Sequence, residues 1–149
     1  MSVAEKGKPD DTHRVARHAS KAVHFADDDR TILTSEAFRP KDGEEDLSVN
    51  WLEYRVGDDE VRIAGVWSDI QSERSIKKKD CLAIVKIDQA KAVGAQMGSA
   101  LTVTHEPTNG NESHSAIWGI EQGAKALQQE LAELGSRYLI ASRIDRRRS

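Results

Sequence analysis

The sequence predicts an α+β domain in which helices pack on a small sheet of three to four strands. Apolar residues recur at helical spacing between residues 124 and 134. The stretch 81–87 is apolar at almost every position, which is typical of a strand covered on both faces. Turn residues at 107–111 separate two further apolar stretches, 101–105 and 114–120, and this arrangement predicts a hairpin.

The first half of the chain contains weaker signals. Apolar residues at helical spacing predict a helix that begins near Asp10 and ends near Asp27. Residues 31–35 favour a short strand. Residues 47–56 fit either a strand or a short helix, with a helix favoured for the second half, because periodicity does not separate the two in so short a run.

The second half gives clearer boundaries, because N-cap and stop residues flank the apolar runs. The expected elements are, in chain order, a helix at 59–71 capped by Asp58 or Asp59, a strand at 81–87, a helix at 88–97 that ends at Gly98, paired strands at 101–105 and 114–120, a helix at 124–134 that ends at Gly135, and a strand at 138–144.

Length and composition restrict the class of protein. A chain of 149 residues has the size of one domain, expected at 10–144 between a flexible leader, 1–9, and a basic tail, 145–149. The net charge of −3 gives no general attraction to nucleic acid or acidic membranes. Cys81 is the single cysteine, which excludes an internal disulfide and indicates a reducing compartment. We therefore expect a cytoplasmic protein outside the membrane, and no motif predicts a cofactor.

The hairpin around His105 and His114 is the first candidate site. Cβ atoms of directly opposed residues in antiparallel strands lie about 5 Å apart, so two opposed imidazoles could share a metal ion, a proton or an anionic ligand. Glu106 and Ser113 are neighbours that could assist catalysis. No third metal ligand is identified, and the competing interpretation is that each histidine bonds a loop carbonyl at the edge of the core.

Basic and aromatic residues supply candidate binding surfaces. On the predicted first helix, basic side chains recur at spacings of three and four and could meet phosphate or an acidic partner; they are Arg14, Arg17, His18 and Lys21. The tail residues Arg146, Arg147 and Arg148 allow the same interpretation. Trp51 and Trp118 are expected in the core or in a pocket wall, although an exposed tryptophan would be a natural anchor for a protein partner.

Four segments of the chain, spread over about residues 36–120, resemble recurring segments of a family of small, uncharacterised bacterial proteins. They read EAFR from Glu36, LSVNWLEY from Leu47, HEP from His105 and SHSAIWG from Ser113. The resemblance implies a bacterial source and a compact domain, and it implies no catalytic residue.

Three functions follow as hypotheses. The leading one is a non-enzymatic accessory or partner-binding module of a bacterial system, because no paired carboxylates or metal-ligand spacing occur in a recognisable setting. The first alternative is a small hydrolase or transferase that uses His105 and His114 as acid and base or as metal ligands. The second is a nucleic-acid-binding protein that uses the basic first helix and the arginine tail. The sequence leaves the oligomeric state open.

Overall fold

A computed structural model of the chain describes residues 8–142. Most of the predicted leader, 1–9, and the whole of the predicted tail, 145–149, lie outside the described residues. Within the described part, no helix is long and apolar enough to cross a membrane.

The described part of the chain forms an α+β fold around one sheet of six antiparallel strands, in the order β4-β5-β2-β1-β3-β6. The class agrees with the sequence prediction, but three to four strands was an underestimate. The strands are β1 (Arg14–Ala19), β2 (Asp46–Trp51), β3 (Cys81–Lys86), β4 (Thr102–His105), β5 (His114–Trp118) and β6 (Leu139–Ala141). The expected pairing of the hairpin strands β4 and β5 is confirmed.

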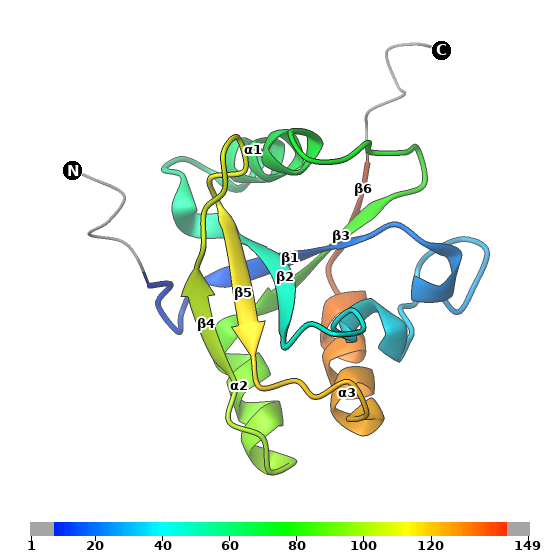
Figure 1. The fold of residues 1–149 in the computed structure, drawn as a ribbon. Helices are drawn as coiled ribbons and strands as arrows, with labels where there is room; N and C mark the ends of the chain where they lie inside the picture. Colours follow the sequence, from blue (N-terminus) through cyan, green and yellow to red (C-terminus); the bar gives the residue numbers. More distant parts are fainter. Residues whose placement is uncertain (1–7, 143–149) are drawn as a thin grey trace.

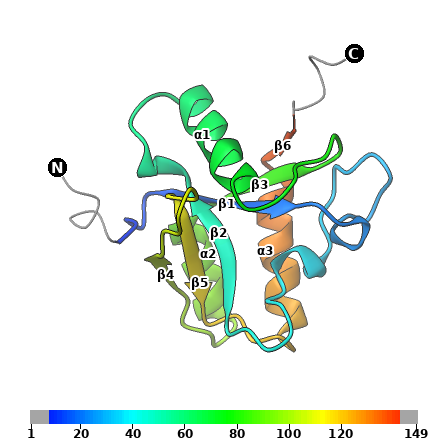
Figure 2. The ribbon, with the colours of Figure 1, turned by 45° about the horizontal axis from the view of Figure 1, so that its top comes forward.

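Helices cover both faces of the sheet. Figures 1 and 2 show α1 on one side and α2 and α3 on the other. The α-helices are α1 (Asp59–Gln71), α2 (Ile87–Gln96) and α3 (Lys125–Ser136), and the short 3₁₀ turns are η2 (Ala22–His24), η3 (Ser35–Phe38) and η4 (Leu52–Tyr54).

Helix α1 has the bounds that the sequence predicts. The Asp58 side chain accepts a hydrogen bond from the backbone N–H of Val61 at 3.0 Å, which satisfies one free donor of the first turn. Its apolar stripe packs on one face of the sheet. The buried residues of this smaller core are Ala16, Leu52, Val66, Ile70, Ile76, Leu82 and Ile84.

The larger core fills the opposite face, under α2, α3 and η3. Alternate residues of β1, β2 and β3 supply the sheet side, and Leu127 and Leu131 supply the helix side. Gly135 is the last residue but one of α3, and a Cβ there would stand only 3.1 Å from the Cβ of Ala83. The glycine is therefore needed for close helix–sheet packing, and the prediction that it stops the helix was wrong.

The predicted first helix does not form, and β1 and η2 occupy its place. Val15 and Ala19 face one core and Ala16 faces the other, so both faces of β1 are buried and no simple apolar alternation marks the strand. The strand favoured at 31–35 is reduced to one bridge between Phe25 and Leu33. Residues 47–56 divide into β2 followed by η4, so the second half is a single 3₁₀ turn.

Candidate functional site

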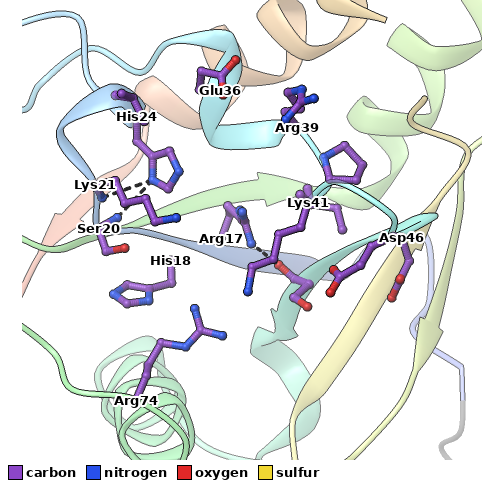
Figure 3. A pocket seen from close by; sticks show the side chains of 15 residues that line it. Arg17, His18, Ser20, Lys21, His24, Glu36, Arg39, Lys41, Asp46 and Arg74 are labelled. Carbon is purple, nitrogen blue, oxygen red and sulfur yellow. Dashed lines mark hydrogen bonds between the residues drawn. The ribbon is translucent and has the colours of Figure 1, made fainter. Parts of the chain in front are cut away.

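A pocket opens where β1 and β2 separate. The two strands pair at Val15 with Trp51 and at Ala16 with Asn50, and beyond these residues their ladder stops. The cavity has a volume of about 180 Å³ and is lined by the second half of β1, the turn after it, the segment from η3 to β2, and Arg74 beyond α1. Figure 3 shows Arg17 at the centre of the labelled side chains, with His24 and Arg39 on one side of it and Arg74 on the other.

Arg17 occupies the gap between the strands. Its Nε donates to the carbonyl of Ala37 at 2.8 Å, and its Nη1 donates to the carbonyl of Ser48 at 2.9 Å. Both acceptors are neutral, and among the described residues no carboxylate forms an ion pair with this guanidinium. Although part of the side chain stays exposed, burial and then the nearby Arg74 lower the pKa of Arg17 to about 10, and the charge of Glu44, which forms no ion pair with it, opposes this shift. A charge without a carboxylate partner is therefore held in the pocket wall, where it favours an anion.

His24 adds a neutral donor to the same pocket. Its Nδ1 accepts hydrogen bonds from the backbone N–H groups of Ser20 at 3.2 Å and Lys21 at 3.4 Å. Because Nδ1 serves as acceptor, the ring proton of neutral His24 resides on Nε2, which is then a donor. Burial, followed by the positive charge of Arg17, lowers the pKa of His24 to about 4. The ring is thus uncharged at neutral pH, and it extends toward the middle of the pocket (Figure 3).

His18 lines the pocket from the face of the sheet that α1 covers. Its Nε2 lies 2.9 Å from Oδ2 of the buried Asp80, which also accepts from the backbone N–H of Lys77. Burial lowers the pKa of His18, and the hydrogen bond to Asp80 opposes this shift. Neutral His18 then donates from Nε2 and carries a lone pair on Nδ1. That atom is buried and has no partner among the described residues, so the pair holds the ring in place without presenting a base to the cavity.

The rim of the pocket carries opposite charges in unequal number. Its cations are Lys21, Arg39, Lys41 and Arg74, and its carboxylates are Glu36, Glu44 and Asp46. Arg39 pairs with Asp42 at 2.8 Å, whereas the other three cations form no ion pair within residues 8–142. Counting Arg17 with the rim, and Asp42 as the partner of Arg39, gives five cations against four carboxylates, a net charge of +1 without the histidines.

The histidines of the hairpin do not meet. The register pairs His105 with Ser115, the neighbour of His114, so the two imidazoles lie on opposite faces of the sheet. His105 Nε2 bonds the carbonyl of Glu112 at 2.7 Å, and His114 Nδ1 bonds the carbonyl of Glu106 at 2.8 Å. The expectation of opposed imidazoles was wrong. The contacts agree with the competing interpretation, in which each histidine bonds a loop carbonyl. A catalytic role for either histidine stays a prediction.

The other hairpin candidates are engaged locally. Glu106 accepts a hydrogen bond from Thr104 Oγ1. Ser113 is fully buried, donates to Asp69 Oδ2 at 2.6 Å and accepts from Asn50 at 2.8 Å. Asp69 in turn receives two hydrogen bonds from Arg55, so this network fastens α1 to β5. In the described part of the chain, no group of three or more His, Cys, Asp or Glu side chains could hold a metal ion.

The expected basic stripe is divided between two places. Arg17, His18 and Lys21 line the pocket, whereas Arg14 lies apart and pairs with Glu53 at 2.6 Å and Asp59 at 2.7 Å. The tail arginines 146–148 lie outside the described residues.

The two tryptophans differ in burial. Trp51 is buried and donates to His13 Nδ1 at 3.0 Å. Trp118 is half-buried and donates to Thr104 Oγ1 at 2.8 Å. Cys81 is buried in β3, and burial raises the pKa of its thiol.

Sequence reasoning missed His24, Arg39, Lys41 and Arg74 as members of one site. The available signal was the run Arg17-His18 followed by Lys21, but the predicted helix placed these side chains on a solvent-facing stripe. The turn at η2 places Lys21 and His24 beside Arg17, and Phe25 at the end of this turn is buried in the larger core.

Comparisons of this chain with protein-family models, curated proteins and solved structures find no match. The resemblance to a family of small bacterial proteins therefore stays a prediction.

Proposed function

We propose that the chain is a non-enzymatic binding module that receives an anionic group of a partner or ligand in the pocket around Arg17. The observation that carries the proposal is the Arg17 guanidinium, which is held between β1 and β2 by two backbone carbonyls and no carboxylate. Placing a charge in this setting costs stability, so a compensating anion is the simplest reason for it.

The surroundings support an anion rather than a cation. Lys21, Lys41 and Arg74 reach the rim without ion-pair partners in the described part, and together with Arg17 these cations outnumber the three rim carboxylates by one. Neutral His24 offers an N–H donor, which binds an oxyanion and has no lone pair on that nitrogen to ligate a metal cation. The pocket therefore combines the inner charge of Arg17 and the inner neutral donor of His24 with the Lys and Arg side chains of the rim.

Size limits what enters. A cavity of about 180 Å³ is smaller than the roughly 300–1,000 Å³ of pockets that enclose a whole drug-sized ligand. It has ample room for a small charged group, because one water needs only about 10–15 Å³ of such volume. We infer that the pocket holds one group while the rest of its carrier stays outside.

The test is NMR chemical-shift mapping of the full chain with sodium phosphate, sodium acetate and sodium succinate at low ionic strength. The proposal expects saturable shifts confined to residues 17–24, 36–48 and 74 with at least one of these anions. Shifts that never saturate, or that spread evenly over the lysines of the surface, would refute a built anion site.

A further inference from the structure

We infer that the group recognised by this pocket is a dianionic phosphoryl group, either inorganic phosphate or the phosphate of a monoester, rather than a carboxylate. The inference rests on the proposed anion-binding function and adds the chemical class of the ligand.

The first step is the number of directed donors. A guanidinium has five N–H groups, and Arg17 uses one on Nε and one on Nη1 for backbone carbonyls. The two N–H groups of Nη2 and one of Nη1 have no partner among the described residues. Neighbouring terminal N–H groups form the fork that binds two oxygens of one anion in parallel.

The second step is His24, which needs an acceptor of its own. Because its Nδ1 is committed to the backbone N–H groups of Ser20 and Lys21, the Nε2–H group is directed away from them. A carboxylate has two oxygens, and the fork of Arg17 engages both. A phosphoryl group has three terminal oxygens, so it can bind the fork and still offer one oxygen to His24.

The third step is charge. Four cations of the lining form no ion pair within the described residues, and they face three lining carboxylates; the four are Arg17, Lys21, Lys41 and Arg74. A phosphate monoester carries between about −1.5 and −2 at pH 7, so these unpaired cations attract it more strongly than they attract the single charge of a carboxylate.

The experiment measures affinity by isothermal titration calorimetry on the full chain at pH 7.5 and low salt. The probes are O-phospho-L-serine, inorganic phosphate, succinate and acetate. Succinate is the critical control, because it carries two charges but only planar carboxylates. The inference expects both phosphoryl probes to bind at least about tenfold more tightly than succinate, the fold-change of one additional charge-assisted hydrogen bond.

Two substitutions at His24 separate the role of Nδ1 as an acceptor from the role of Nε2 as a donor. His24→Asn keeps an acceptor near Nδ1 and loses the Nε2 donor, whereas His24→Gln keeps a donor near Nε2. We expect His24→Asn to lose at least about tenfold in affinity for O-phospho-L-serine while its affinity for acetate changes little. We expect His24→Gln to retain most of the phosphoryl preference, and circular dichroism confirms that both variants are folded.

The outcomes are distinguishable. If no probe binds, the proposed function fails and the inference fails with it. If succinate binds as tightly as O-phospho-L-serine, anion binding stands and the phosphoryl inference is overturned. Equal binding of inorganic phosphate and O-phospho-L-serine supports the phosphoryl class and assigns recognition to the head group alone, and tighter binding of O-phospho-L-serine supports the monoester.

Discussion

Replacement of Arg17 by methionine separates the cost of its charge from the function of that charge. The substitution removes two hydrogen bonds to backbone carbonyls, each worth about 1.5–3 kcal/mol when one partner is charged. It also removes a buried charge whose pKa, lowered from 12.5 to about 10, corresponds to at most about 3 kcal/mol, and partial exposure reduces that figure. Because the two effects oppose each other, we expect the free energy of unfolding to fall by less than the roughly 3–6 kcal/mol of the two hydrogen bonds alone.

The response to phosphate should change far more. A ligand at about 100 times its Kd stabilises a protein by about 2.7 kcal/mol, which for a chain of this length raises Tm by about 5–10 °C. We expect this increase for the wild-type protein and none for Arg17→Met. Differential scanning fluorimetry with sodium phosphate, at ionic strength held constant with sodium chloride, measures it.

Arg14→Met is the matched control. Arg14 lies on the same strand and its loss changes the net charge equally, but its side chain pairs with Glu53 and Asp59 away from the pocket. The control should unfold at a lower temperature without phosphate and still gain the full increase with it. An undiminished phosphate response in Arg17→Met, or an equal loss in both variants, would refute the assignment of Arg17.

Three further predictions concern stability. Burial is the main cause that lowers the pKa of His24 from 6.5 to about 4. Between pH 6.5 and about 4, His24 is therefore protonated in the unfolded chain and neutral in the folded chain. Stability should therefore fall by on the order of 2 kcal/mol as pH decreases from about 6.5 to 4, and His24→Asn, measured by urea unfolding at each pH, should flatten that decline. Ser113→Ala leaves Asp69 and Asn50 each with one hydrogen bond fewer and should cost about 1–3 kcal/mol in urea; a change below 0.5 kcal/mol would contradict a structural role. Gly119→Ala should cost more than about 1 kcal/mol, because φ is +107° and the new Cβ would stand 2.4 Å from the carbonyl oxygen of Ala100. Gly123→Ala, where nothing lies within 4 Å of the new Cβ, should be close to neutral when both glycine variants are measured by urea unfolding.

Elements with local signals could be predicted from the sequence. Helix α1 has an Asp58 cap and an apolar stripe that faces one core, so its two ends and its buried face agree with the pattern. The hairpin strands are separated by a polar turn and were also found. In both cases the decisive information lies within about 15 neighbouring residues.

Strand β1 could not be predicted in this way. Its inward positions include Arg17 and His18, whose polar side chains are accommodated by Ala37, Ser48 and Asp80 from distant segments. Without knowledge of these partners, the spacing of Val15 and Ala19 fits a helix. The error at β1 also concealed the pocket, because tertiary hydrogen bonds rather than local propensity decide the conformation there.

The candidate site depends on strand order as well as on composition. In the sheet, β1 lies between β2 and β3, two strands that α1 separates in the chain. This order brings together the three parts of the pocket, residues 17–24, 36–48 and 74. The sequence identified part of the basic cluster, Arg17 with Lys21, but it contained no signal that Arg74 joins them. The hairpin site was predicted for a register in which His105 faces His114, whereas in the structure His105 pairs with Ser115, one residue further along β5.

The most direct test of an anion site at Arg17 is a crystal structure of the full chain grown with sodium tungstate, a tetrahedral dianion that anomalous scattering locates without ambiguity. We expect tungstate oxygens within hydrogen-bond distance of the Arg17 guanidinium and of His24 Nε2, with Ser20 and Lys21 still donating to His24 Nδ1. Tungstate bound at surface lysines alone, with the pocket around Arg17 free of it, would contradict the account.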